Sequence, residues 1–298
     1  MKIWYVLIYL LASVTPIVQA QDAKPHLVTG VNFDANYFAS ESNGKYGVIV
    51  LTGSGGGKAT DTAKRIADMG YPVLSLAYFN DRFDDGVIPD ALEMIPLEYF
   101  EAPQKWLMNR EETRNDGVIV LGLSKGAELA LVLATHDAQY KGVIAVGPSA
   151  VVWAGIPRDR STLTSASSSW SVKGKPLAFV PYIPREGLMM AGLNKFIDWH
   201  TASLINAKAV EKALIKVEKI QSPILLLSGG QDLSWPANRM AAAVCKRANS
   251  IKNEALCTHV NYENAGHMIG SNRQFNVDSD AGVAAHKEIA KFLSSLNQ

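Results

Sequence analysis

Residues 117–126 read GVIVLGLSKG, and this stretch decides how the chain folds. The run from Gly117 to Leu123 is continuously apolar and rich in β-branched residues, which is typical of a strand buried on both faces of a parallel sheet. Residues 127–136 follow at once and predict a helix. A strand that turns sharply into a helix is the unit from which doubly wound α/β sheets are built.

The same alternation of short apolar runs and amphipathic runs extends from Tyr46 towards the C-terminus. It predicts further strands at 46–52, 72–78, 141–146, 223–228 and 258–263, and further helices at 59–69, 204–217, 237–246 and 281–296. Right-handed crossovers place such helices on both faces of a mostly parallel sheet.

Two regions interrupt this alternation. Residues 80–95 form a polar loop, and Pro103 further on either starts or kinks a helix. Residues 148–200 have no clear period, and a stretch of this length inside a compact domain is usually functional or disordered. We therefore expect residues 21–147 and 219–298 to form an α/β core, with residues 148–218 inserted over it as a cap or lid.

The composition excludes several classes of protein. Of the 298 residues, 48% are apolar and 19% are charged, which favours a packed globular chain. The 29 Lys and Arg residues nearly balance the 28 Asp and Glu residues, so we expect no nucleic-acid partner. The composition does not determine an oligomeric state.

Residues 1–20 have the layout of a secretory signal peptide. Lys2 is their only charge, an apolar run covers residues 3–11, and Val18-Gln19-Ala20 suits a signal peptidase. We expect cleavage after Ala20 and a secreted or periplasmic product, and a retained signal anchor is the alternative. No later stretch is long and uncharged enough to cross a bilayer, so no stable membrane insertion is expected after cleavage.

The pentapeptide Gly122-Leu123-Ser124-Lys125-Gly126 has the pattern G-x-S-x-G between a predicted strand and a predicted helix. This is the setting of a nucleophile elbow, in which a strained turn projects the serine hydroxyl clear of the sheet. The glycines allow close approach of neighbouring elements. We expect Ser124 to be a nucleophile, and a tight structural turn is the alternative.

A base and an acid follow in the order that this chemistry requires. His267 lies in a loop after the last apolar strand and is the expected base, with His200 in the insertion as its one competitor. Asp232 follows the strand at 223–228 and is expected to orient the imidazole. The order Ser124, Asp232, His267 is that of the α/β-hydrolase fold.

The oxyanion of an acyl-transfer reaction needs backbone donors. One is expected at the N–H of Lys125, after the nucleophile, and the other in the glycine loop 53–57, at Ser54 or Gly55. Lys58 raises the alternative of a phosphate-binding loop, but Ala59 stands where that motif needs Ser or Thr. We expect no cofactor and no metal.

Several motifs together resemble a known family. They are GSGGG at 53–57, LAYF at 76–79, IPLEYF at 95–100, LSKGAEL at 123–129 and CKR at 245–247. They look like the catalytic domain of acyl-CoA thioesterases of the bile-acid-CoA:amino-acid N-acyltransferase family, from about Gly47 to His267. By this resemblance Ser124, Asp232 and His267 fall on the family's triad, and a serine nucleophile is associated with hydrolysis.

The resemblance implies a serine hydrolase that cleaves a small-molecule acyl thioester through an acyl-enzyme. A signal peptide fits poorly with acyl-CoA, a cytosolic metabolite. A carboxylesterase or amidohydrolase acting on an exported substrate, and an acyl-CoA:amino-acid N-acyltransferase, therefore remain alternatives. A non-catalytic binding protein on the same scaffold is a further class.

Two further features are the pair of cysteines and the character of the inserted segment. Cys245 and Cys257 are 12 residues apart and form either a disulfide or two buried thiols. The insertion is aromatic and carries six basic against three acidic residues between positions 153 and 199. It is either a lid that forms an acyl pocket or an ordinary packed cap.

Overall fold

The computed structural model describes residues 23–297, apart from residues 30, 81–87, 187, 188, 190, 191, 193, 194, 251–255 and 270–278. The predicted signal peptide lies outside these residues. The strands are β1 His26–Leu27, β2 Asp34–Phe38, β3 Lys45–Leu51, β4 Val73–Ala77, β5 Ile95–Pro96, β6 Thr113–Leu123, β7 Tyr140–Val146, β8 Trp170–Val172, β9 Lys175–Pro176, β10 Ile224–Gly229 and β11 Cys257–Tyr262. The α-helices are α1 Thr60–Ala67, α2 Glu101–Met108, α3 Lys125–His136, α5 Phe196–Ser203, α6 Ala207–Ala213, α7 Ala237–Asn249 and α8 Asp280–Ser295, with 3-10 turns η1 Leu97–Phe100, η2 Arg160–Ser165 and η3 Val217–Lys219.

One large sheet organises the described part of the chain. Its eight strands lie in the order β1-β2-β4-β3-β6-β7-β10-β11. All neighbours from β4 to β11 pair in parallel, whereas β2 runs antiparallel to both β1 and β4. The prediction of a mostly parallel α/β fold is therefore confirmed. The sequence analysis missed β2, because its five residues DANYF alternate between half-buried and buried positions and lack a continuous apolar run.

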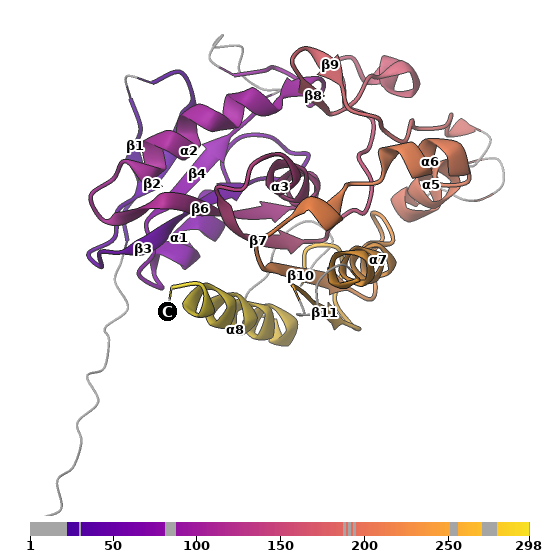
Figure 1. The fold of residues 1–298 in the computed structure, drawn as a ribbon. Coiled ribbons are helices and arrows are strands. Elements are labelled where there is room, and N and C mark those ends of the chain that lie inside the picture. The colour runs from indigo at the N-terminus through magenta and orange to yellow at the C-terminus, as the bar shows by residue number, and fades with distance from the viewer. Residues whose placement is uncertain are drawn as a thin grey trace, which may run out of the picture.

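Apolar side chains cover both faces of this sheet. Along β3, Ile49 and Leu51 join the core layer that includes residues of α2, α3 and α7, while Val48 and Val50 join the layer under α1 and α8. Successive strand side chains point to opposite faces, so a strand buried twice must be apolar throughout. This explains why the central strands could be recognised from sequence. Figure 1 shows α8 lying along one side of the sheet, with α2 and α3 on the other.

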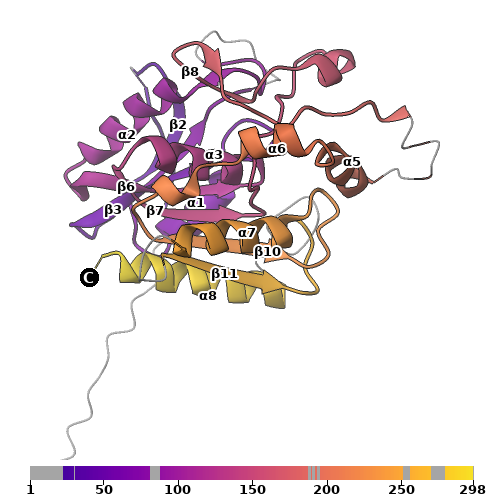
Figure 2. The ribbon, with the colours of Figure 1, turned by 45° about the vertical axis from the view of Figure 1, so that its right-hand side comes forward.

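The segment from residue 148 to 218 has its own secondary structure. Strand β8 pairs in parallel with β5 and antiparallel with β9, which forms a second, three-stranded sheet in the described residues. Figures 1 and 2 show this segment, coloured pink to orange, running from β8 around one side of the molecule to α5 and α6. Its assignment as a separate cap remains a prediction.

One helix prediction needs correction, and one helix was not predicted. The expected helix at 204–217 is wrong in extent, because Asn206 caps the N-terminus of α6 and Leu214 leaves the helix to form a β-bridge with Val151. Helix α5 was missed.

Pro103 lies in the first turn of α2, where a missing N–H costs no intrahelical hydrogen bond. Within the described ranges, no helix combines the length and apolarity that a membrane span requires.

Candidate active site

Ser124 stands between the end of β6 and the start of α3. Its backbone has φ 54° and ψ −115°, a sparsely populated conformation that costs about 1–3 kcal/mol and persists only where its surroundings enforce it. A β-carbon on Gly122 would lie 2.0 Å from the carbonyl oxygen of Gly126, and one on Gly126 would lie 2.3 Å from that of Thr52. Both positions therefore exclude any side chain. This is the geometry of a nucleophile elbow.

The structure brings Ser124, His267 and Asp232 into one hydrogen-bonded chain. His267 Nε2 lies 2.8 Å from Ser124 Oγ, and His267 Nδ1 lies 2.7 Å from Asp232 Oδ2. An ionised carboxylate only accepts, so Nδ1–H donates to Asp232, and the Nε2 lone pair is left to accept the serine proton. His267 and Asp232 are both 5% exposed.

Backbone amides hold the carboxylate in place. Asp232 Oδ1 accepts hydrogen bonds from the N–H groups of Ser234 at 2.7 Å and Trp235 at 3.2 Å. The Asp232 carboxylate therefore uses one oxygen for the loop and the other for His267. This arrangement orients the imidazole and can stabilise the imidazolium that forms when a serine proton is taken.

Trp235 and Gly147 lie beside the His267 ring, and neither was predicted from the sequence. The Trp235 ring stands edge-on to His267 at 5.3 Å, and its Nε1–H donates to the Gly147 carbonyl at 3.2 Å. Gly147 has φ 62° and follows β7 directly. Neither Trp235 nor Gly147 belongs to a recognisable motif. The only signal in the sequence was the place of Gly147 directly after a predicted strand.

His200, the competitor for the base, occupies a different environment. Its Nδ1–H donates to the Phe196 carbonyl at 2.8 Å, and its ring contacts Trp153 and Trp235 edge-on at 4.8 and 5.5 Å. Burial lowers the pKa of His200 to about 4. The structure places His267, and not His200, against the Ser124 hydroxyl.

The predicted oxyanion loop lies beside the elbow. A β-carbon on Gly53 would lie 3.1 Å from Ser124 Cβ and 3.7 Å from its Oγ, so this part of the loop lies beside the nucleophile. The N–H of Gly56 donates to the Gly53 carbonyl and that of Gly57 to the Phe79 carbonyl. The N–H groups of Gly56 and Gly57 are therefore already used in hydrogen bonds to backbone carbonyls.

Other predicted features lie away from this centre. Lys58, the basis of the phosphate-loop alternative, forms an ion pair with Asp34 of β2. Cys245 of α7 and Cys257 of β11 are joined as a disulfide with a Cα–Cα distance of 5.0 Å. Cys257 begins β11, at the end of the strand remote from the loop that carries His267. No metal-binding cluster of His, Cys, Asp or Glu is found among the described residues.

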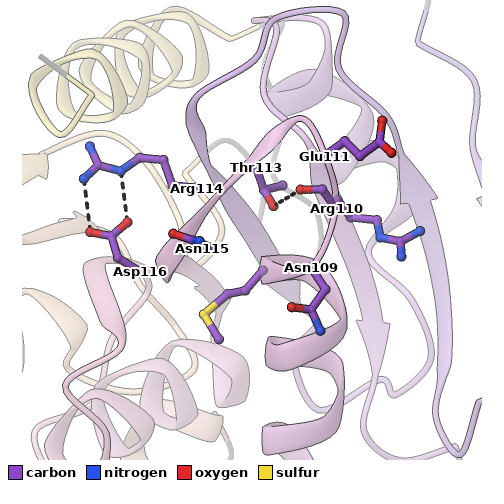
Figure 3. Close-up of a pocket in the computed structure, with 8 residues that line it drawn as sticks. Asn109, Arg110, Glu111, Thr113, Arg114, Asn115 and Asp116 are labelled. Carbon is purple, nitrogen blue, oxygen red and sulfur yellow. Dashed lines mark hydrogen bonds and ion pairs between the residues drawn. The ribbon is translucent and has the colours of Figure 1, made fainter.

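A polar pocket of about 590 Å³ lies at the opposite end of β6, where α2 ends and the strand begins (Figure 3). Figure 3 shows Arg114 paired with Asp116 at its edge. Eight residues separate Asp116 from Ser124, and a strand rises about 3.3 Å per residue, so the two sites are about 25 Å apart. This pocket is not part of the Ser124 site.

The mostly parallel sheet, the elbow and the hydrogen-bonded chain of Ser124, His267 and Asp232 are together those of an α/β-hydrolase fold. The chain belongs to the family described as BAAT / Acyl-CoA thioester hydrolase C terminal, whose model matches residues 95–271. The resemblance drawn from the motifs is thus confirmed.

Individual relatives agree with this assignment. Human acyl-coenzyme A thioesterase 2, mitochondrial, is 30% identical over 228 residues, which cover 75% of this chain and 42% of the relative. The chain spans about half the length of the curated relatives it matches.

Solved structures share the fold. A putative dienelactone hydrolase from Klebsiella pneumoniae superposes with a TM-score of 0.58 at 14% identity, covering 91% of this chain and 98% of that one. The Pyrococcus horikoshii acylaminoacyl peptidase gives a TM-score of 0.58 at 13% identity, covering 92% of this chain and 42% of that one.

Proposed function

We propose that this protein is a serine-dependent acyl hydrolase whose substrate is a small acyl thioester of the acyl-CoA type. The observation that carries the proposal is the pair of contacts that His267 makes, one to Ser124 Oγ and one to Asp232. Membership of the thioester hydrolase family supports the substrate class.

In the proposed reaction, His267 Nε2 takes the hydroxyl proton as Ser124 Oγ attacks the acyl carbonyl. Asp232 stabilises the imidazolium. Collapse of the tetrahedral intermediate breaks the bond to the leaving group, which receives the proton from His267. Water then enters and attacks the acyl-enzyme as His267 takes one of its protons, and collapse of the second tetrahedral intermediate releases the acid while His267 returns that proton to Ser124 Oγ.

The oxyanion requires donors near Ser124 Oγ. We propose the backbone N–H groups of Lys125 and Ser54 for this role. The Ser54 amide follows Gly53, which lies beside the nucleophile, whereas the Gly56 and Gly57 amides already donate to carbonyls. This favours Ser54 over its neighbour Gly55, because the Ser54 amide nitrogen is the one that is joined by the peptide bond to Gly53, the residue beside the nucleophile. Removing one such donor typically costs about 100- to 1000-fold in rate.

The disulfide favours an exported enzyme and keeps a second substrate class open. Disulfides persist in oxidising compartments, and residues 1–20 read as a signal peptide, so we propose that the protein is secreted or periplasmic. An exported enzyme would meet little cytosolic acyl-CoA, so an ester, another thioester or an amide is the second candidate substrate class. Fractionation of expressing cells, with N-terminal sequencing of the product, tests export: a chain beginning at Gln21 supports it, and an uncleaved cytosolic chain contradicts it.

Labelling by a fluorophosphonate probe tests the nucleophile. The expected result is labelling of the wild type and loss of labelling in Ser124→Ala. Ser228→Ala is a matched control, because Ser228 Oγ also lies 2.7 Å from a histidine nitrogen, that of His259, but is fully buried within β10 and not on an elbow. An unlabelled wild type, or loss of labelling in the Ser228 variant alone, overturns the proposal.

A matched pair of substrates, an acyl thioester and the oxygen ester of the same acyl group, tests the leaving group. Faster turnover of the thioester is expected. Faster turnover of the oxygen ester would indicate an esterase instead of a thioesterase. Adding an amine such as glycine distinguishes transfer, since an acyltransferase makes the amide and a hydrolase makes only the acid.

A further inference from the structure

Lys125, the residue that follows the nucleophile, takes part in a buried ion pair. Lys125 Nζ bonds to Glu128 Oε2 at 2.7 Å, and the two side chains are 2% and 0% exposed. Both residues belong to the first turn of α3. Burying two charges costs several kcal/mol per ion before their attraction offsets it, so such a pair is a poor way to gain stability. Its position next to Ser124 calls for another reason.

The remaining partners of this pair come from the segment between residues 148 and 218. Lys125 Nζ also donates to Ser169 Oγ at 2.7 Å, while Glu128 Oε1 accepts from Trp170 Nε1 at 2.8 Å and from the Trp153 backbone N–H at 3.1 Å. These hydrogen bonds attach the inserted segment to the turn of helix that carries one predicted oxyanion donor, the Lys125 N–H.

The two predicted sources of oxyanion donors, the start of α3 at Lys125 and the glycine loop 53–57, are called here the two oxyanion arms. The Trp170 ring also lies against a residue that supports the second arm. Its centroid lies 5.4 Å from Lys125 Nζ and 5.9 Å from the ring of Tyr78. Tyr78 OH donates to the Thr52 carbonyl at 2.8 Å, at the residue that opens the glycine loop. Trp170 is fully buried. One indole thus touches the supports of both arms.

We propose that Trp170 and Glu128 are positioning residues that brace the two oxyanion arms against each other, so that docking of the inserted segment sets the rate of the chemical step. The proposal rests on the proposed function of Ser124. A strained backbone such as that of Ser124 persists only where its surroundings over-determine it, and this network supplies fixed contacts on the side of α3. Neither residue is expected to touch the substrate.

The test compares Trp170→Phe with Trp199→Phe. Each change removes one indole hydrogen bond from a buried ring, but the Trp199 bond goes to the Ile183 carbonyl and not to Glu128. The measurements are kcat and KM for an acyl thioester per fluorophosphonate-titrated site, and the inhibition constant of a trifluoromethyl ketone, which forms a tetrahedral oxyanion. Ser169→Ala, a smaller change that removes one Lys125 partner, covers the case in which Trp170→Phe fails to fold.

Because misplacement by about 1 Å can cost about 100-fold, we expect kcat of Trp170→Phe to fall about 10- to 100-fold with little change in KM. Inhibitor affinity should fall by a similar factor, and Ser169→Ala should change in the same direction. Trp199→Phe should keep the wild-type kcat per titrated site. A merely structural role would lower the melting temperature and the number of titrated sites but not these constants.

Two contrary results are distinguishable. In the first, the wild type is labelled, but Trp170→Phe matches Trp199→Phe in kcat and inhibitor affinity. If Trp170→Phe does not fold, Ser169→Ala takes its place in this comparison. This result overturns the positioning role and leaves the proposed function standing. If the wild type itself is neither labelled nor active, the proposed function fails and the brace fails with it.

Discussion

A β-carbon on Gly147 would lie 2.8 Å from the carbonyl oxygen of His267 and 3.1 Å from its ring carbon Cε1. Gly147 also accepts the indole hydrogen bond of Trp235, the ring that stands edge-on to the same imidazole. The end of β7 thus sets how closely the histidine loop approaches the elbow. A glycine with no catalytic group of its own determines where the proposed base lies.

Gly147→Ala should therefore lower activity. The added methyl group displaces the His267 loop, and a displacement of about 1 Å can cost about 100-fold in kcat/KM. Gly174→Ala is the matched control, because Gly174 has a similar φ of 73° but nothing within 4 Å of a β-carbon. Steady-state hydrolysis of a chromogenic ester measures both. Equal losses in the two variants would assign the effect to backbone strain instead of displacement.

Asp232→Asn should leave the loop intact and remove most of the activity. The amide oxygen can still accept from Ser234 and Trp235, but its nitrogen would face His267 Nδ1 and favour the wrong tautomer. In a comparable triad the same exchange lowers kcat about 10⁴-fold. Stopped-flow or overnight assays at pH 7, with the melting temperature as a check on folding, measure the loss. A folded variant with near-wild-type kcat would contradict the role of Asp232.

Removing the Cys245–Cys257 disulfide should destabilise the fold without changing the chemistry. A disulfide between residues 12 apart lowers the conformational entropy of the unfolded chain and so raises its free energy by about 3 kcal/mol. Cys245→Ala with Cys257→Ala should lower the free energy of unfolding by about that amount in urea, while kcat at 25 °C stays unchanged. Reductant should lower the stability of the wild type but not that of the double variant. A large loss of kcat in the folded variant would contradict this separation.

Burial of His200 should make stability depend on pH in a defined window. Desolvation lowers its pKa to about 4 from an ordinary 6.5, so between these values the unfolded chain binds a proton that the folded chain does not. The free energy of unfolding should therefore decrease as pH falls from 6.5 to 4, by about 3 kcal/mol in total, and this contribution should level off below pH 4. Urea unfolding of the wild type and of His200→Gln across this range isolates the effect. A constant difference between the two proteins would refute it.

The core strands were predictable because of how they are buried. Strands β3, β6 and β10 are covered on both faces over most of their length, so their buried positions are almost all apolar and the run is visible in the sequence. Strand β2 has a half-buried pattern and no such run, and α5 lies in an aromatic stretch without helical period. Their identity depends on partners far away in the chain, which local sequence does not display.

The sequence by itself determined the βα units, the elbow at Ser124 and the chain order of the three side chains, because backbone sterics and strand burial restrict residue types locally. Only the tertiary structure decided that His267 and not His200 meets Ser124. It also decided that Cys245 pairs with Cys257, and that Gly147, Trp235 and the Lys125–Glu128 pair surround the site. Those contacts join residues distant in sequence, and the free energy of such contacts depends on packing in three dimensions that no local pattern encodes.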